Sequence, residues 1–316
     1  MIYAVQGHAP TADFRMSVAR RMRETLAPYR ARSGVYDLVA YHLGWVDADG
    51  SPSNVPAGKL LRPVLCLTAS GGYGDALAAL DAAVAIELLH AFSLVHDDIE
   101  DGDTERRHRP TLWTLRGVPL AINAGDSLFA LAHRTLVAAA EGLAPDRALT
   151  ALRLFDDAVL RMIEGQHDDL EFESRPAVSL EAYLRMTSGK TGALIGASLA
   201  LGGLFGGGPD ADLGVLCEAG VAIGLAFQAV DDALAVWGDA RRTGKAVGND
   251  AARGKKSLPV VLARESSDGE SLRAATLAVA AEHAERGRAL LRGTSMRSRA
   301  VDELNAVIDF ILERES

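Results

Sequence analysis

The 316-residue chain has few aromatic residues, which make up 5% of it, and only two cysteines. A low aromatic content together with abundant alanine favours closely packed helices over a β-sandwich. Cys66 and Cys217 lie far apart in apolar runs, so we predict that both are buried thiols. This cysteine content excludes a disulfide framework and a zinc site built on cysteine.

The chain also has no excess of basic residues, since its formal net charge is -9. A nucleic-acid-binding protein normally presents a basic face, so we expect no nucleic-acid partner. The first residues lack a charged start followed by an apolar stretch, so we expect no signal peptide. No run of about 18 uncharged apolar residues is present, so we expect no membrane span. These absences together predict a cytoplasmic protein.

Hydrophobic residues make up 48% of the chain, which is enough to bury a large core. Residues 45–58 and 239–257 are rich in turn-forming residues and are predicted loops. The second loop is unusually long for a compact domain, so we predict that it has a functional role. We predict a single all-α domain over residues 1–316, with about ten helices around a central space. Helical patterns occur over residues 11–31, 77–102, 121–141, 147–171, 179–205, 213–238, 270–288 and 297–314.

A first acidic cluster, residues 97–103, closes a strongly apolar helical stretch. Asp97 and Asp101 are four residues apart, so their carboxylates share one helix face at the end where the macrodipole disfavours acids. A cation would offset both penalties, and Mg²⁺ suits carboxylate, water and phosphate oxygens. A solvated acidic helix end is the alternative. Residues 105–110 add three arginines, which either pair with the acids or grip phosphate.

A second acidic cluster ends another apolar stretch with the adjacent pair Asp231 and Asp232. The position four residues after Asp231 is Ala235, so this cluster has fewer acids, although Asp239 could contribute if the helix continues. Glycines and lysines follow over residues 243–257. Glycine lets the backbone approach a phosphate and lysine supplies a point charge, while a solvated basic loop is the alternative.

Five short segments occur in a definite order along the chain. They are Gly58–Pro63, Asp97–Asp101 with Arg106 and Arg107 after it, Gly165–Leu170, Lys190–Gly192, and Phe227–Asp232. The ordered set resembles the motifs of the trans-isoprenyl diphosphate synthases, the polyprenyl synthetase family, and is most similar to bacterial geranylgeranyl diphosphate synthases. The departure is Ala235, where many members carry a third Asp; some members lack it and carry a segment similar to Trp237-Gly-Asp239.

The resemblance implies an all-α prenyltransferase fold, a homodimer, and two acidic motifs that face each other across a deep cavity. The implied Mg²⁺ ligands are Asp97, Asp98, Asp101, Asp231 and Asp232. The implied contacts to isopentenyl diphosphate are Lys59, Arg62, His90 and Arg107. The implied contacts to the allylic diphosphate are Arg106, Lys190, Thr191, Gln228, Lys245 and Lys255. The implied catalytic set is Asp97, Asp98, Asp101, Arg106, Lys190, Asp231, Asp232 and Lys245.

The implied reaction joins isopentenyl diphosphate to an allylic diphosphate by Mg²⁺-assisted ionisation, condensation and proton loss. The growing tail would run from the acids along the helix, one turn of which rises about 5.4 Å. Phe92 and Ser93 lie five and four residues before Asp97. We expect Phe92 to form a floor that stops growth at geranylgeranyl diphosphate, although plain core packing would also explain it.

Two other functions fit the same fold. A terpene cyclase would ionise a prenyl diphosphate alone and would need no site for isopentenyl diphosphate. The retained set Lys59, Arg62, His90 and Arg107 disfavours it. A non-catalytic regulatory subunit is disfavoured by the intact acids of both motifs, although Ala235 leaves this alternative open.

Overall fold

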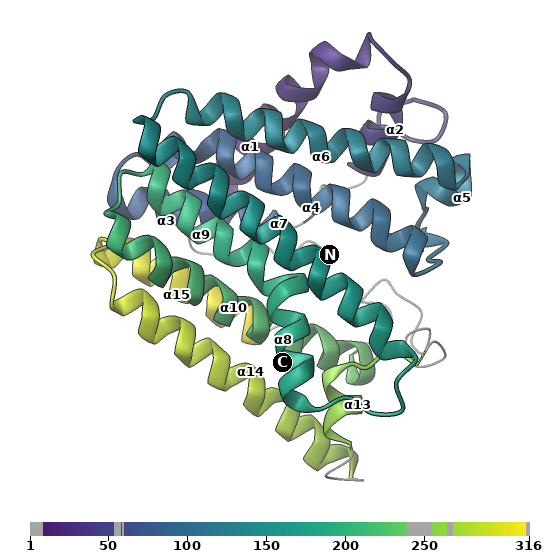
Figure 1. Ribbon diagram of the computed structural model, residues 1–316, viewed down its shortest axis with the longest axis vertical. Helices are drawn as coiled ribbons and strands as arrows, with labels where there is room; N and C mark the ends of the chain where they lie inside the picture. The colour runs from purple at the N-terminus through teal and green to yellow at the C-terminus, as the bar shows by residue number, and fades with distance from the viewer. Residues whose placement is uncertain (1–8, 54–57, 59, 239–253, 264–267, 314–316) are drawn as a thin grey trace. The chain divides into compact units, whose positions relative to one another are not determined.

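The computed structural model describes residues 9–53, 58, 60–238, 254–263 and 268–313 (Figure 1). Lys59, Lys245, Asp239 and most of the predicted loop 239–257 lie outside the described residues. The chain forms two compact units. Unit 1 comprises residues 1–67 and 77–152, and unit 2 comprises residues 68–76 and 153–316. The prediction of one domain over residues 1–316 stays a prediction.

Unit 1 holds the helices of the N-terminal half and a short hairpin. Its elements are α1 (Ala9–Arg30), α2 (Val35–His42), the start of α3 (Leu61–Tyr73), most of a 3₁₀ turn (Ala76–Ala79), α4 (Leu80–Glu100), β1 (Glu105–Arg106), β2 (Arg109–Pro110), α5 (Leu112–Arg116), α6 (Val118–Ala140) and the start of α7 (Pro145–Glu173). The helix α4 packs along α6 and also contacts α1 (Figure 1). Every residue from Ala82 to Ile86 is therefore fully buried.

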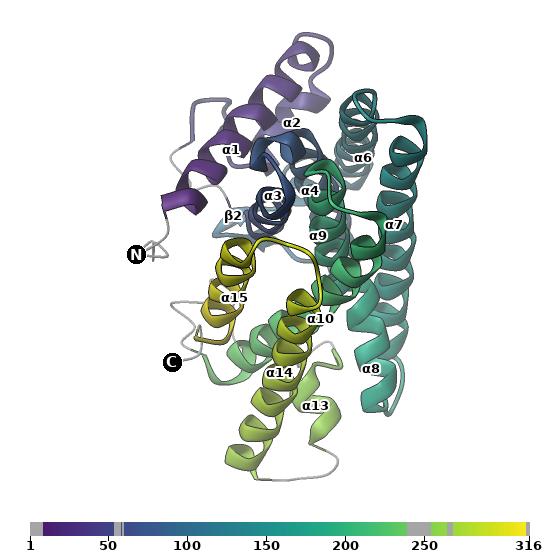
Figure 2. The ribbon, with the colours of Figure 1, turned by 90° about the vertical axis from the view of Figure 1, so that its left-hand side faces the viewer.

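Unit 2 is built around the helices α9 and α10. Its elements are the ends of α3 and α7, α8 (Leu180–Thr187), the π-helical turn η2 (Ser188–Gly192), α9 (Ala193–Phe205), α10 (Asp210–Trp237), α13 (Leu258–Leu262), α14 (Gly269–Arg292) and α15 (Ser298–Glu313). Every residue from Ala193 to Leu204 is buried, as expected of a helix that is apolar on all sides. The helix α10 packs against both α9 and α14 (Figure 2).

The helices α9 and α10 approach each other backbone to backbone. A Cβ atom added at Gly220 would lie 2.6 Å from the Cα of Gly196 and 2.6 Å from the carbonyl oxygen of Ile195. No side chain can occupy that space without moving one of the helices. The close approach also brings the first turn of α9 and the preceding η2 against α10, which carries the second acidic motif.

The structure confirms the all-α fold class, and the helical patterns locate most of the long helices. The predicted helix over 179–205 is instead interrupted by the π turn η2. The helices α2, α3, α5 and α13 and the hairpin lie outside the predicted helical ranges. The helix α2 spans 8 residues, α5 and α13 span 5 each and each strand spans 2, which is too short for a hydrophobic period to show.

Two helical stretches are long and apolar enough to cross a membrane by length and composition. They are Ala76–Glu100, which contains α4, and α10. In the most apolar window of each, 56% and 61% of the window is buried inside the protein. Buried core helices pass the same test, so the expected absence of a membrane span stays a prediction.

The close packing of α9 and α10 predicts that alanine substitution at two glycines of α10 changes the free energy of unfolding in opposite directions. Gly220→Ala should lower the free energy of unfolding by about 1–3 kcal/mol, because the new methyl group meets backbone atoms. Gly214→Ala is the matched control, since a Cβ there has nothing within 4 Å and should stabilise α10 by up to about 1 kcal/mol. Urea unfolding of both variants measures the difference. Equal stability of Gly220→Ala and wild type would contradict the packing.

Candidate functional site

The first acidic motif lies where α4 ends. Asp101 follows the last helical residue, and its backbone N–H donates to the carbonyl oxygen of Asp97 at 2.8 Å. The helical geometry therefore extends to Asp101, and Asp97 and Asp101 lie on the same side, as their spacing predicts. Asp98 points elsewhere, because only 2% of it is exposed, whereas Asp97 and Asp101 are partly exposed.

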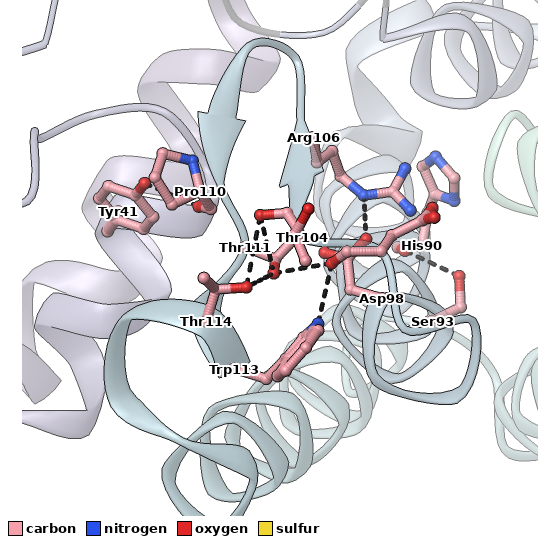
Figure 3. A network of polar contacts seen from close by, with 11 residues as sticks. Tyr41, His90, Ser93, Asp98, Thr104, Arg106, Pro110, Thr111, Trp113 and Thr114 are labelled. Atoms are coloured by element: carbon pink, nitrogen blue, oxygen red, sulfur yellow. Dashed lines mark hydrogen bonds and ion pairs between the residues drawn. The ribbon is translucent and has the colours of Figure 1, made fainter. Parts of the chain in front are cut away.

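Asp98 forms an ion pair with the hairpin that follows the motif. The Nε atom of Arg106 donates to Oδ1 of Asp98 at 2.6 Å, as Figure 3 shows. Burial raises the pKa of Asp98 to about 6, and the charge and hydrogen bond of Arg106 oppose that rise. A buried carboxylate needs such a partner, because an unpaired one would be strongly destabilising.

The hairpin turn holds two residues in left-handed backbone conformations. Arg107 has φ 54° and His108 has φ 60°, a region that costs a non-glycine residue about 1–2 kcal/mol. Hydrogen bonds on the motif side hold the segment in place (Figure 3). The carbonyl oxygen of Asp103 accepts from Thr111 Oγ1 at 2.9 Å and from Trp113 Nε1 at 2.8 Å. Strain of this kind persists where the surroundings impose it, which is common at functional sites.

The third arginine of this segment, Arg109, ties the hairpin to the end of α2. Its guanidinium donates to the carbonyl oxygen of Val46 at 2.6 Å and to that of Tyr41 at 3.2 Å. The Tyr41 hydroxyl in turn donates to the carbonyl oxygen of Pro110 at 2.8 Å. Of the two uses that the sequence left open for these arginines, Arg106 shows pairing with a motif acid, whereas Arg109 binds backbone carbonyls and lies 3.4 Å from a carboxylate oxygen of Asp47.

A pocket in unit 1 is lined by α2, α4 and the hairpin. Gly58 and Leu60, which flank Lys59, also line it. Its ionisable lining includes His90 and Arg107, both predicted to bind isopentenyl diphosphate, together with His42, Glu87, Asp98, Arg106 and Arg109. Arg62 is also predicted to bind isopentenyl diphosphate. Its positive charge lowers the pKa of both His90 and Glu87.

Positive charge dominates the electrostatics of this pocket. Burial, together with the charges of the nearby Arg106 and Arg107, lowers the pKa of His42 to about 3. Burial, Arg62 and Arg107 likewise lower the pKa of His90. Both imidazoles are thus neutral at pH 7 and can donate or accept hydrogen bonds, while the guanidinium groups carry the charge. Such a lining fits a polyanion such as a diphosphate.

The second acidic motif places its two carboxylates differently. Asp232 is buried, and its Oδ2 accepts from the Tyr183 hydroxyl and from the Leu258 backbone N–H, each at 2.6 Å. Its Oδ1 accepts from Gln228 Nε2 at 2.8 Å. Burial raises the pKa of Asp232, and these hydrogen bonds oppose the rise. Asp231 is partly exposed, and Ala235 is exposed on the same helix.

The π turn η2 presents Lys190 and Thr191 to neighbouring polar groups of unit 2. Lys190 Nζ donates to Oδ2 of Asp169 at 2.6 Å, and Lys255 Nζ lies 4.0 Å from the same oxygen. Thr191 Oγ1 donates to Oε1 of Gln228 at 3.0 Å. The structure therefore brings together residues predicted to bind the allylic diphosphate from α10, η2 and the segment before α13. Single π turns often mark functional positions in helices.

The predicted chain-length residue Phe92 lies in an aromatic cluster between α4 and α6. Its ring centroid is 4.7 Å from that of His96 and 5.1 Å from that of Phe129. The hydroxyl of Ser93 donates to the carbonyl oxygen of His90 at 2.8 Å, so this side chain is used locally. Tilted rings at these distances pack favourably and fix the position of the Phe92 ring.

Some site residues were not predicted from the sequence. Asp169 lies in the Gly165–Leu170 segment, which marked it without giving it a role. His42, Glu87 and Tyr183 carry no sequence signal, since each is one polar residue in an otherwise ordinary helix. Lys59 and Lys245, which were predicted, lie outside the described residues, and whether the two motifs face each other stays a prediction.

The donor set at the motifs fits Mg²⁺. Among the described residues, no three His, Cys, Asp or Glu side chains converge to hold a metal by themselves. Mg²⁺ does not need such a group, because it commonly takes one or two carboxylates and completes its shell with water and substrate phosphates. Asp97 and Asp101 on one face supply two carboxylates, and Asp231 supplies another in unit 2.

The lowered pKa of His42 predicts a loss of stability in acid. The folded pKa is about 3 against an ordinary value of 6.5, so the unfolded chain binds the proton more readily. This contribution to folding is complete above pH 6.5 and is lost as the pH falls toward 3. His42→Gln should remove about 1–2 kcal/mol of the wild-type stability loss between pH 7 and pH 5.

Urea unfolding at both pH values measures this difference, and the remaining ionisable groups cancel in the comparison with wild type. His167→Gln, at an exposed position of α7, is the control and should leave the loss unchanged. An unchanged pH dependence in His42→Gln would show that the His42 imidazole becomes protonated without cost in the folded protein.

Comparison with known proteins places the chain in a family. Residues 51–291 match the family Polyprenyl synthetase. A geranylgeranyl diphosphate synthase of Mycobacterium tuberculosis is 39% identical over 315 residues, which cover 95% of this chain and 89% of that protein. A (2E,6E)-farnesyl diphosphate synthase of Mycobacterium bovis is 43% identical over 258 residues, 81% of this chain and 69% of that protein. The crystal structure of a polyprenyl synthetase from Streptomyces coelicolor A3(2) matches with a TM-score of 0.84 and 34% identity, covering 95% of this chain and 98% of that one. The chain therefore belongs to the polyprenyl synthetase family.

Proposed function

We propose that the chain is a prenyltransferase that joins isopentenyl diphosphate to an allylic diphosphate and makes a longer trans-prenyl diphosphate, geranylgeranyl diphosphate. The observation that carries the proposal is the pocket of unit 1, in which His90, Arg106 and Arg107 gather beside the first acidic motif. Family membership and the names of the similar proteins, geranylgeranyl and farnesyl diphosphate synthases, support it.

In this proposal the pocket of unit 1 binds isopentenyl diphosphate. Arg62 and Arg107 neutralise the diphosphate, and the neutral imidazole of His90 donates a hydrogen bond. Lys59 completes the predicted set. These contacts hold the carbon–carbon double bond in place, and positioning a reactant in this way removes much of the entropic barrier to condensation.

The diphosphate of the allylic substrate is the leaving group. Asp97, Asp101 and Asp231 would hold Mg²⁺, which supplies Lewis-acid neutralisation of the charge on the diphosphate as its C–O bond breaks. Lys190 and Lys255 lie together at Asp169 and add positive charge for the same anion. The apolar surface of α4 behind the acids excludes water, which would otherwise trap the allylic cation as an alcohol. The double bond of isopentenyl diphosphate attacks the allylic cation and forms the new carbon–carbon bond, and loss of a proton to the departed diphosphate then completes the product.

We also propose that the protein is a homodimer, as the resemblance to the polyprenyl synthetase family implies. Large apolar side chains are exposed on α5 and α6 of unit 1, namely Leu115, Val118, Leu120, Ile122 and Val137. An exposed apolar surface of this kind is typical of a protein interface. The cytoplasmic location and the lack of a nucleic-acid partner stay predictions.

Incubation with Mg²⁺, isopentenyl diphosphate and each allylic starter in turn tests the function. Elongated prenyl alcohols after dephosphorylation, ending mainly at twenty carbons, are the expected result.

Arg107→Ala should raise the KM for isopentenyl diphosphate about tenfold or more, because it removes a charged phosphate contact. A cyclic hydrocarbon formed without isopentenyl diphosphate would show a terpene cyclase instead. No product from any starter would favour the regulatory subunit.

The position of Phe92 predicts control over product length. Phe92→Ala should lengthen the main product by one or more isoprene units, because one helical turn of about 5.4 Å becomes open to the tail. Phe92→Tyr keeps the ring and should leave the product length unchanged. Chromatography of the dephosphorylated products measures both. The same product from Phe92→Ala and wild type would assign the ring to core packing alone.

A further inference from the structure

Backbone strain in the described part of the chain is concentrated at the pocket of unit 1. Among the described residues, the non-glycine residues with positive φ are Leu60, Arg107 and His108. Leu60 and Arg107 both line the pocket, and His108 follows Arg107 in the hairpin turn. Such conformations persist only where the surroundings impose them. Two segments far apart in the sequence are therefore held in strained conformations around one pocket.

The two segments meet where Gly58 faces the guanidinium of Arg107. A Cβ atom added at Gly58 would lie 2.7 Å from Nη2, 3.2 Å from Cζ and 3.3 Å from Nη1 of Arg107. Heavy atoms in favourable contact lie about 3.5–4.0 Å apart, so a methyl group and the guanidinium cannot both occupy this space. Gly58 is not among the glycines with positive φ, so it is the space, and not the backbone conformation, that a side chain here would lack.

The backbone on each side of this contact is anchored. Leu60 is 8% exposed, and its carbonyl oxygen accepts from the Val64 N–H at 3.1 Å at the start of α3. Arg106 and Arg109, on the two sides of the hairpin turn, donate hydrogen bonds to α4 and to α2. The long side chain of Arg107 is the flexible part of the contact, because it has many rotamers. A larger residue at position 58 would therefore displace the Arg107 guanidinium and leave the backbone in place.

The position of this guanidinium also determines its electrostatic partners. Burial lowers the pKa of Arg107, and the charge of Glu87 opposes that change. Arg62 and Arg107 both lower the pKa of Glu87 and of His90, so the two arginines act on the same pair of side chains. Two guanidinium groups that converge in this way can bind one diphosphate together. A displaced Arg107 would leave Arg62 to bind the anion without it.

We propose that Gly58 is a positioning residue for isopentenyl diphosphate: its missing side chain is the space that holds the Arg107 guanidinium at the pocket, so the size of residue 58 sets the affinity for the diphosphate. The proposal rests on the proposed function and concerns a residue to which the family resemblance assigns no role. Lys59 and Arg62 of the same segment act by charge, whereas Gly58 acts by leaving space.

Binding of isopentenyl diphosphate to the full-length protein without Mg²⁺, measured by calorimetry, tests this role. Gly58→Ala should raise the dissociation constant about tenfold, because a charged phosphate contact is lost. Gly34→Ala is the matched control in the same unit, since a Cβ there has nothing within 4 Å and Gly34 has a φ of -61°. The control should stay within about twofold of wild type. A wild-type dissociation constant in Gly58→Ala would overturn the proposal.

A double-mutant cycle shows whether Gly58 acts through Arg107. Arg107→Lys keeps the positive charge but removes the branched guanidinium that the new methyl group would meet. In the Arg107→Lys background, Gly58→Ala should change the dissociation constant by less than about twofold, because the group it displaces is already absent. A further loss of about tenfold in that background would show that Gly58 acts on another group, which would contradict the proposal.

Thermal unfolding and turnover separate positioning from a role in folding. The midpoint of Gly58→Ala should stay within about 2 °C of wild type, because a flexible side chain yields and the backbone does not. The same variant should raise the KM for isopentenyl diphosphate about tenfold and leave the KM for the allylic substrate within about twofold. A rise in both KM values together with a lower midpoint would assign Gly58 to the stability of the fold and sink the proposal.

A measurement without ligand keeps this proposal separate from the proposed function. In isotope-labelled protein, the side-chain Nε–H resonance of Arg107 is identified by its loss in Arg107→Lys. Gly58→Ala should shift this resonance, and Gly34→Ala should leave it in place. A wild-type protein that neither binds isopentenyl diphosphate nor elongates any starter would end the proposed function. An unshifted resonance in Gly58→Ala would instead show that Gly58 does not hold the Arg107 guanidinium.

Discussion

The ion pair between Asp98 and Arg106 is the interaction on which the pocket of unit 1 depends. A carboxylate buried at the end of an apolar helix is strongly destabilising unless a partner with good geometry compensates it. Arg106 provides that partner at 2.6 Å and so fixes the strand from which the strained turn begins. The left-handed conformations of Arg107 and His108 then place a guanidinium at the pocket, where several positive groups already lie close together.

That concentration of positive charge is unfavourable in the free protein. Burial and the arginines keep His42 and His90 neutral, so the pocket adds hydrogen-bonding groups without adding further charge. The structure thus gives up stability at one place in order to present a surface complementary to an anion. An anion that binds only the folded chain would return that stability, so binding and folding are coupled here.

Unit 2 also compensates a buried carboxylate, but with neutral hydrogen-bond donors instead of an arginine. Its buried carboxylate, Asp232, is surrounded by neutral donors, and the network continues through Gln228 to Thr191 on the π turn. Backbone contact between Gly196 and Gly220 lets α9 and α10 come close enough for these groups to meet. Lys190 and Lys255 both lie beside the carboxylate of Asp169. Unit 2 therefore pairs basic side chains with a carboxylate, as unit 1 does with Arg106 and Asp98.

The sequence by itself determined the helical class, most long helices and the two acidic helix ends, and it supplied the candidate site residues. Those features follow from local periodicity and from the order of short motifs, both of which are written along the chain. Only the tertiary structure decided which aspartate of each pair is buried, that His42 joins His90 in one pocket, and that a π turn interrupts residues 179–205. Periodicity sets the face on which a residue lies, but the element that covers that face comes from distant parts of the chain, and its burial and hydrogen bonds decide the role.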